Sequence, residues 1–215
     1  MRVLILTAVS PEREAVLRGL ADAEAGVFDV QLAGVGPMQA AINTTKALAA
    51  GQYDLVISAG IAGGFVGVAD VGSVVISTEI IAADLGAETP DGFSSLDELG
   101  FGKTRVPVDA ELVKRVTEAV RQTGLAVHAG PILTLSTVTG TAETAAELAR
   151  RIPGASAEGM EGYGVALAAH ERGIPVLELR TISNPVGPRN RAAWKMKEAF
   201  AALETASKAL MEVLR

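Results

Sequence analysis

The chain has no cysteine and only two histidines among its 215 residues. The lack of cysteine excludes disulfides, thiolate metal sites and cysteine nucleophiles. No apolar run is long enough to span a bilayer, and the amino-terminal segment lacks the cleavage region of a secretory signal. We therefore expect a cytosolic protein with no membrane partner and no metal.

Basic residues are fewer than acidic ones, 19 against 25, and the net charge is −6. Non-specific nucleic-acid binding needs a basic face, so nucleic acid is not an expected partner, and an anionic substrate would need local cations. Hydrophobic residues make up 49% of the chain, which is enough for a substantial core.

Apolar runs that predict buried strands alternate with segments of helical periodicity. The expected strands are residues 3–9, 27–33, 54–59, 71–81, 126–137 and 176–183, and the expected helices are residues 12–21, 38–50, 109–122, 141–151, 160–172 and 191–214. Ser10 is the expected N-cap of the first helix. The pattern predicts a single domain over residues 1–215, with α/β architecture: three α/β/α layers around a central mixed, mostly parallel twisted sheet.

Two glycine-rich turns follow predicted strands. The turn at residues 34–36 (GVG) lacks the third glycine and the later acidic residue of a dinucleotide fingerprint, so no such cofactor is expected. The turn at residues 59–65 (AGIAGGF) has small residues at a strand end, where backbone N–H groups can approach a ligand, although a plain connection is the alternative. Residues 84–105 have no clear period and predict a long surface excursion, and such segments are often functional.

Four segments, in order, resemble the methylthioadenosine/S-adenosylhomocysteine nucleosidases of the nucleoside phosphorylase superfamily. They are GVGPMQAA (34–41), AGIAGGF (59–65), AEGMEGYGVA (157–166) and LRTISN (179–184). Two further segments, DLG with PDGF (84–93) and SNPVGPRNRAAW (183–194), are most similar to the futalosine hydrolase subfamily. The resemblance implies hydrolysis of the N-glycosidic bond of futalosine in menaquinone biosynthesis, with no cofactor, in a homo-oligomer built from dimers.

The resemblance also implies roles for acidic residues. Glu14, early in the first helix, would activate the attacking water, with Glu12 as the nearby alternative; either carboxylate could instead only favour the helix N-terminus. Glu161 would bind the ribose 2′- and 3′-hydroxyls, and Met160 would pack against the sugar. From the residues alone, Glu161 at the head of an apolar helix is either a partner of the helix dipole or a site residue.

Asn184 stands where the adenine-specific relatives carry aspartate. A 6-oxopurine has acceptors at N7 and O6, and the amide of Asn184 has two N–H donors to meet them, so hypoxanthine or guanine is expected in preference to adenine. Asn184 followed by proline is also a common turn pair.

The resemblance implies further contacts with the substrate. Those with the base and sugar fall at Ile61, Ala62, Gly63, Val138 and Thr139. Ile61 replaces a serine that is common in related nucleosidases.

Futalosine carries an aromatic carboxylate, for which Arg189 and Arg191 are the candidate partners. Arg191 is expected at the start of the last helix, where a cation opposes the helix dipole. Solvated arginines are the equally weighted alternative. Phe93 could stack on the aromatic group, with a core or lid role as the alternative.

Other functions remain open at this stage. A purine nucleoside phosphorylase would need arginines near the glycine turns, which contain none, although Arg13 is close in sequence. An adenine-directed nucleosidase and a nucleoside-binding regulatory protein are the remaining alternatives, and the retention of Glu14 and Glu161 argues against the regulatory protein.

Overall fold

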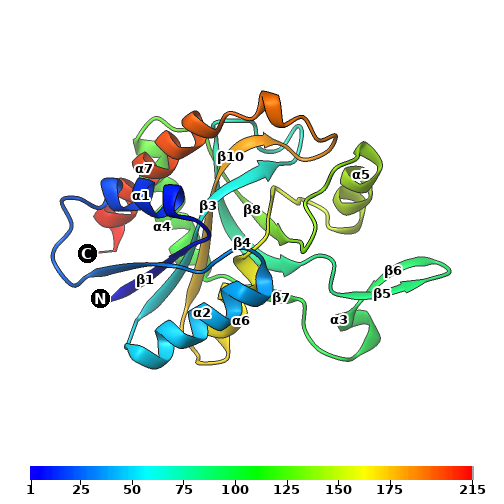
Figure 1. Cartoon of the computed structure of the whole chain (residues 1–215), viewed down its shortest axis with the longest axis horizontal. Coiled ribbons are helices and arrows are strands. Elements are labelled where there is room, and N and C mark those ends of the chain that lie inside the picture. The colour runs from blue at the N-terminus through cyan, green and yellow to red at the C-terminus, as the bar shows by residue number, and fades with distance from the viewer. Residues whose placement is uncertain (215) are drawn as a thin grey trace.

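Eight strands form one mixed sheet in the computed structural model, which describes residues 1–214 (Figure 1). They are β1 (Val3–Thr7), β2 (Phe28–Leu32), β3 (Leu55–Gly64), β4 (Val74–Ala82), β7 (Arg105–Pro107), β8 (Val127–Thr134), β9 (Ala157–Gly159) and β10 (Val176–Pro185). The order is β10-β4-β8-β9-β3-β1-β2, with β7 beside β4. Most pairings are parallel, and the antiparallel ones are β10 with β4, β3 with β9 and β4 with β7. The predicted fold class is confirmed.

The sheet also curls until two of its strands meet. Strand β10 pairs with both β4 and β3, so β3, β9, β8, β4 and β10 form a closed circuit. Small and branched side chains fill part of its interior, among them Ala62, Val75, Ile132, Ala157 and Ile182. The sequence did not predict this closure, because it depends on long-range pairing.

Helices cover both faces of the sheet (Figure 1). On one face, α1 (Ser10–Gly19) and α4 (Ala110–Gln122) pack against α7 (Met196–Val213). On the other face, α2 (Pro37–Ala50) packs on α6 (Gly162–His170), and each layer buries its own aliphatic core. Helix α5 (Ala142–Arg151) covers the far ends of β4 and β8 with a third cluster. None of the helices in residues 1–214 is both long and apolar enough to cross a membrane.

The predicted excursion at residues 84–105 contains a hairpin of β5 (Gly86–Thr89) and β6 (Gly92–Ser95), followed by the short helix α3 (Leu96–Leu99). The hairpin projects from the side of the molecule in Figure 1.

Several boundaries differ from the prediction. Ser10 is the first residue of α1 and not its cap, because the chain is still extended at Val9. Strand β3 continues through the glycine cluster, and β9 precedes a later start of α6. Helix α7 begins at Met196, after a 3-10 turn, η1 (Arg191–Ala193). Arg191 therefore does not oppose the dipole of α7, and that argument for an anion-binding role is wrong.

Candidate active site

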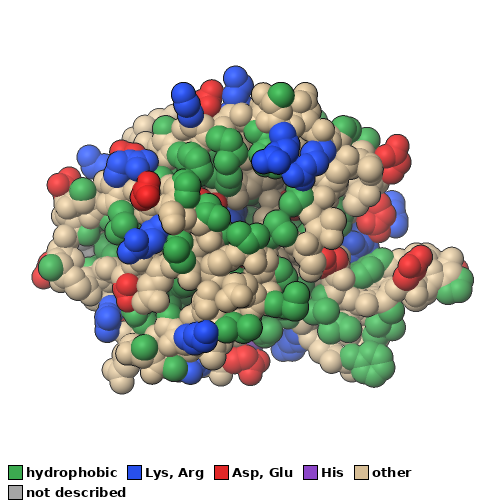
Figure 2. Space-filling model, in the orientation of Figure 1, with side chains coloured by type: hydrophobic (Ala, Val, Ile, Leu, Met, Phe, Trp, Pro, Cys, Tyr) green, Lys and Arg blue, Asp and Glu red, His purple; other side chains and the backbone are tan. Residues whose placement is uncertain are grey.

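A cavity of about 460 Å³ opens at the carboxyl ends of β1, β3 and β10. It brings together nine of the residues predicted from the sequence: Ile61, Ala62, Gly63, Val138, Thr139, Met160, Glu161, Asn184 and Arg191. Figure 2 shows a recess in the upper half of the molecule, between hydrophobic side chains and a group of basic ones. A wider hollow around Arg2 and Tyr53 contains none of the predicted site residues.

Glu12 lies on the floor of this cavity and is only 3% exposed. Its Oε2 accepts the backbone N–H groups of Ala8 (2.9 Å) and Val9 (3.2 Å), and its Oε1 accepts that of Ile61 (2.9 Å). The carboxylate thus ties the end of β1 to the end of β3. Burial raises its pKa, against the opposing effect of Arg180. A buried carboxylate with a raised pKa beside a cavity is typical of a general base.

Glu14 is exposed and does not line the cavity. Successive residues of a helix are about 100° apart, so Glu14 lies nearly opposite Glu12 on α1. The buried residues of α1 are Glu12, Ala15, Val16 and Gly19, which places Glu12 on the inward face. The prediction that placed Glu14 at the site is wrong, and the alternative residue, Glu12, occupies that position.

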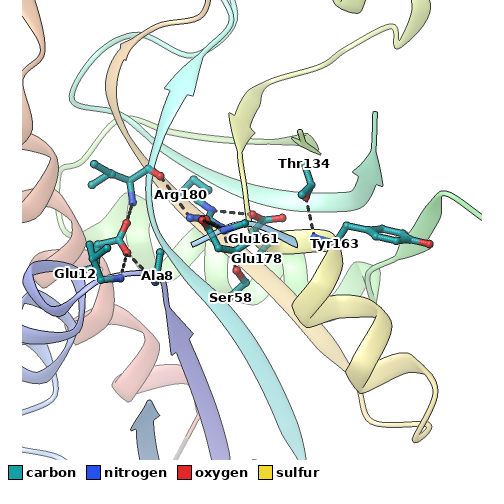
Figure 3. A network of polar contacts seen from close by, with 11 residues as sticks. Ala8, Glu12, Ser58, Thr134, Glu161, Tyr163, Glu178 and Arg180 are labelled. Atoms are coloured by element: carbon teal, nitrogen blue, oxygen red, sulfur yellow. Dashed lines mark hydrogen bonds and ion pairs between the residues drawn. The ribbon is translucent and has the colours of Figure 1, made fainter. Parts of the chain in front are cut away.

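A buried guanidinium joins the acidic residues beneath the cavity (Figure 3). The Nε of Arg180 donates to Oε1 of Glu178 at 2.7 Å, and its Nη2 lies 3.4 Å from Oε2 of Glu161. Nη2 also donates to Ser58 Oγ at 3.1 Å. Although burial alone would lower it, the three carboxylates of Glu178, Glu161 and Glu12 raise the pKa of Arg180. One buried cation therefore pairs with Glu178 and Glu161 and acts on Glu12 through its charge.

Glu161 occupies the N-cap position of α6 but its side chain does not cap the helix. Its Oε1 instead accepts the N–H of Gly36, in the first glycine turn, at 3.2 Å. Gly36 has φ of 88°, a conformation that favours glycine. The carboxylate of Glu161 is thus fixed at the cavity wall by Gly36 and Arg180, which favours the site interpretation over the dipole one.

The glycines of β3 make room for side chains of the protein itself. A Cβ at Gly60 would lie 2.5 Å from Oε1 of Glu12 and 2.8 Å from Nη1 of Arg180. A Cβ at Gly63 would lie 3.0 Å from Val186 and 3.4 Å from Nδ2 of Asn184. The sequence suggested that this cluster admits a ligand, and the structure adds that Gly60 admits the charged network.

Asn184 projects from the end of β10 and is half-buried. Its Oδ1 accepts the hydroxyl of Ser183 at 2.8 Å, and its Nδ2 donates to the carbonyl of Pro185 at 3.0 Å. Since an amide nitrogen carries two hydrogens, one donor remains for a ligand.

Of the three residues predicted to contact the aromatic carboxylate of the substrate, the cavity includes only one among the described residues that line it. Arg191 lines the cavity beside Trp194, whereas Arg189 does not line it, and the guanidinium of Arg189 lies 5.5 Å from the centre of the Trp194 ring. Phe93 lies outside the cavity, where the guanidinium of Arg151 stacks on it at 4.1 Å. The hairpin carries Phe93 toward α5, so the prediction that it contacts a substrate in this cavity is wrong for this chain by itself.

Sequence reasoning missed three charged residues here. Glu178 and Arg180 lie in a buried strand, and Glu158, in β9, lines the cavity. A charged residue at alternate positions of an otherwise apolar strand was the available signal for the first two. Arg13 points away from the site, because its Nε donates to the carbonyl of Val30 on β2.

Comparisons with known proteins agree with this architecture. The sequence model of the phosphorylase superfamily matches residues 16–215. A futalosine hydrolase from Streptomyces coelicolor is 51% identical, with 100% of this chain and 97% of that protein covered. One from Acidothermus cellulolyticus is 46% identical, with 96% and 89% covered.

Among solved structures, a methylthioadenosine/S-adenosylhomocysteine nucleosidase from S. pneumoniae, bound to a transition-state inhibitor, superimposes with a TM-score of 0.84. The two share 22% identity over all of both chains, so this likeness concerns the fold. The chain is a member of the phosphorylase superfamily. Within it, the chain belongs to the futalosine hydrolase family.

Proposed function

We propose that this protein hydrolyses the N-glycosidic bond of futalosine, releasing hypoxanthine and dehypoxanthine futalosine in menaquinone biosynthesis. The observation that carries the proposal is the meeting of Glu12, Glu161 and Asn184 around one cavity. These groups supply a base, a partner for sugar hydroxyls and a donor for the leaving purine. The names of the full-length relatives point to the same substrate.

In this mechanism Glu12 takes a proton from water, whose oxygen attacks C1′ of the ribose. The bond from C1′ to N9 breaks, and its electron pair leaves with the purine. Positive charge develops on the ribose in the transition state, and the carboxylate of Glu161 stabilises it through the hydroxyls that it holds. Met160, on the cavity wall, packs against the sugar.

The leaving purine needs stabilisation without a proton from the enzyme. Asn184 has no acidic group, so its N–H donates to N7 or O6 as negative charge grows on the base. An amide donor suits a 6-oxopurine. Val138 and Thr139 also line the cavity and would contact the base.

Water is the nucleophile that this site favours over phosphate. Among the described residues that line the cavity, Arg191 is the one cation, and it lies at the rim with Trp194. Phosphate attack on C1′ would need cations beside Glu12, where Arg180 is already paired with Glu178 and Glu161. Arg191 is better placed for the carboxylate of futalosine.

We also infer that the enzyme is a cytosolic homo-oligomer. Met38 is 77% exposed and Ile42 51% exposed on α2, and both are large apolar side chains. Met38 and Leu85 line an apolar hollow of about 320 Å³ beside α6. A second copy of the chain would cover this surface.

The test of the substrate is a panel of futalosine, inosine and methylthioadenosine, each with and without phosphate. Free base is followed by chromatography. The proposal predicts hypoxanthine from futalosine at the same rate in both conditions. Base release that requires phosphate would assign the protein to the phosphorylases, and adenine released from methylthioadenosine alone would contradict the role of Asn184.

A further inference from the structure

Glu158 is a buried carboxylate whose place at the cavity has no role in the mechanism above. It is 6% exposed and lines the same cavity as Asn184. One of its oxygens accepts the backbone N–H of Thr139 at 2.8 Å, and the other accepts the hydroxyl of Thr139. None of the ion pairs found within residues 1–214 includes Glu158.

The contacts of Glu158 leave it with unused acceptor capacity. An ionised carboxylate has about four acceptor positions, and Thr139 occupies two of them. Burial raises the pKa of Glu158, and the charge of Asp84 adds to this, while the two bonds from Thr139 act in the opposite direction. A donor from a bound ligand would therefore compensate a charge that the fold leaves poorly solvated.

The sheet places Glu158 and Asn184 in one row. In the strand register, Gly63 of β3 is opposite Asn184 on one side and Glu158 on the other. Side chains at paired positions point to the same face of a sheet, and a Cβ on Gly63 would point toward Asn184. Two strand spacings are about 10 Å, and Gly63 places no side chain of its own between Glu158 and Asn184, where Val186 approaches instead.

The donor of Asn184 and the acceptor of Glu158 match the hydrogen-bonding edge of a 6-oxopurine. In a 6-oxopurine, N7 and O6 accept hydrogen bonds and the adjacent N1 carries a hydrogen. Asn184 supplies its remaining donor to N7 or O6, and Glu158 supplies an acceptor. In adenine, N1 is an acceptor and the 6-substituent is a donor, so both positions mismatch.

We propose that Glu158, held by Thr139, is a specificity-determining residue that accepts the N1–H of a 6-oxopurine base. The inference rests on the proposed function and extends it to the opposite edge of the base. Glu158 also keeps the backbone N–H of Thr139 occupied, so that this donor cannot bind N1 of adenine. The chain thus discriminates in both directions, by an attractive contact to one base and a blocked donor for the other.

Free-base binding tests the inference without depending on turnover. Titration calorimetry would compare hypoxanthine, 1-methylhypoxanthine and adenine on the unmodified protein and on Glu158→Met. The exposed Glu24→Gln serves as the control, and thermal melts confirm folding. We expect the unmodified protein to bind hypoxanthine at least about tenfold more tightly than 1-methylhypoxanthine, which lacks N1–H.

In Glu158→Met, hypoxanthine affinity should fall about tenfold or more while adenine affinity is kept or rises. Glu158→Gln should fall between the two proteins, since it keeps one acceptor and loses the charge. A parallel loss for both bases would show a purely structural role, and unchanged affinities would show no contact; either result overturns the inference. So does an unmodified protein that does not distinguish the methylated base.

Kinetics with futalosine give a second, independent readout. The contact to N1–H is made in the substrate as well as in the transition state, so its loss should raise KM more than it lowers kcat. A fall in kcat at constant KM would contradict this. A protein that binds hypoxanthine selectively and yet never cleaves futalosine would overturn the proposed function alone.

Discussion

At the scale of single residues, the charge on Glu12 controls the proposed reaction. Three backbone N–H groups and Arg180 favour the ionised form, yet burial has the largest effect and raises the pKa, with Glu161 acting in the same direction. A general base must be ionised, so activity is lost as the pH falls through this raised pKa. We expect the acid limb of kcat/KM to lie above the value of about 4.3 that is ordinary for glutamate.

The measurement is kcat/KM for futalosine against pH in buffers of constant ionic strength. An acid limb at or below the ordinary glutamate value would contradict the assignment of Glu12 as the base that limits activity.

The base preference depends on Asn184. Asn184→Asp replaces an amide donor with a group that donates only when protonated, so release of hypoxanthine should slow and adenine nucleosides should gain. We expect the ratio of the two kcat/KM values to shift by about tenfold or more toward adenine. If the variant and the parent cleaved futalosine equally well, Asn184 would not determine the base preference.

The sequence could identify some of these residues and not others. Glu161 stood out because it is a carboxylate at the head of an apolar helix, and Asn184 because the resemblance places it where the adenine-specific relatives carry aspartate. Glu12 was left open against Glu14, although the helical phase of Ala15, Val16 and Gly19 would have separated them. Glu158 could not be identified, because its position opposite Gly63 depends on a pairing between distant strands.

At the scale of elements, the close approach of α1 and β10 to β3 depends on Gly60. In Gly60→Ala the added Cβ would meet Oε1 of Glu12 and Nη1 of Arg180 at 2.5 and 2.8 Å. Neither group can move without losing its buried partners. We expect a loss of about 1–3 kcal/mol in the free energy of unfolding, together with most of the activity.

Denaturant titration and the futalosine assay would check this. Gly102→Ala is the matched control, because a Cβ there would meet Leu96 at an ordinary 3.7 Å. If both alanine variants behaved like the parent, the crowding at Gly60 would not matter to the site.

The elements themselves were largely predictable, since long apolar runs and helical periods mark them. Besides the closure of the sheet, some short elements and boundaries were not. Strand β9 has three residues, too few for a period, and β3 continues through glycines that normally end a strand. The start of α7 at Met196 comes after a 3-10 turn, η1, which the helical period of residues 191–214 did not indicate.

At the scale of the whole molecule, the exposed apolar side chains of α2 predict assembly. Met38→Glu would place a charge in the proposed interface, twice in a two-fold dimer. We expect the parent to be an oligomer by light scattering, and the variant to dissociate at a protein concentration about tenfold higher or more. A monomeric parent would exclude the interface, and an unaffected oligomer would move it elsewhere.

The proposed hydrolysis of futalosine depends on the cavity whose floor is Glu12. The most direct measurement is hypoxanthine release from futalosine, without phosphate, by the parent and by two variants of α1. Glu12→Gln should lower kcat by about 10²–10⁴-fold, whereas Glu14→Gln, on the exposed side of the same helix, should match the parent. A Glu12→Gln protein that retains full turnover, or a Glu14→Gln protein that loses it, would show that Glu12 is not the base.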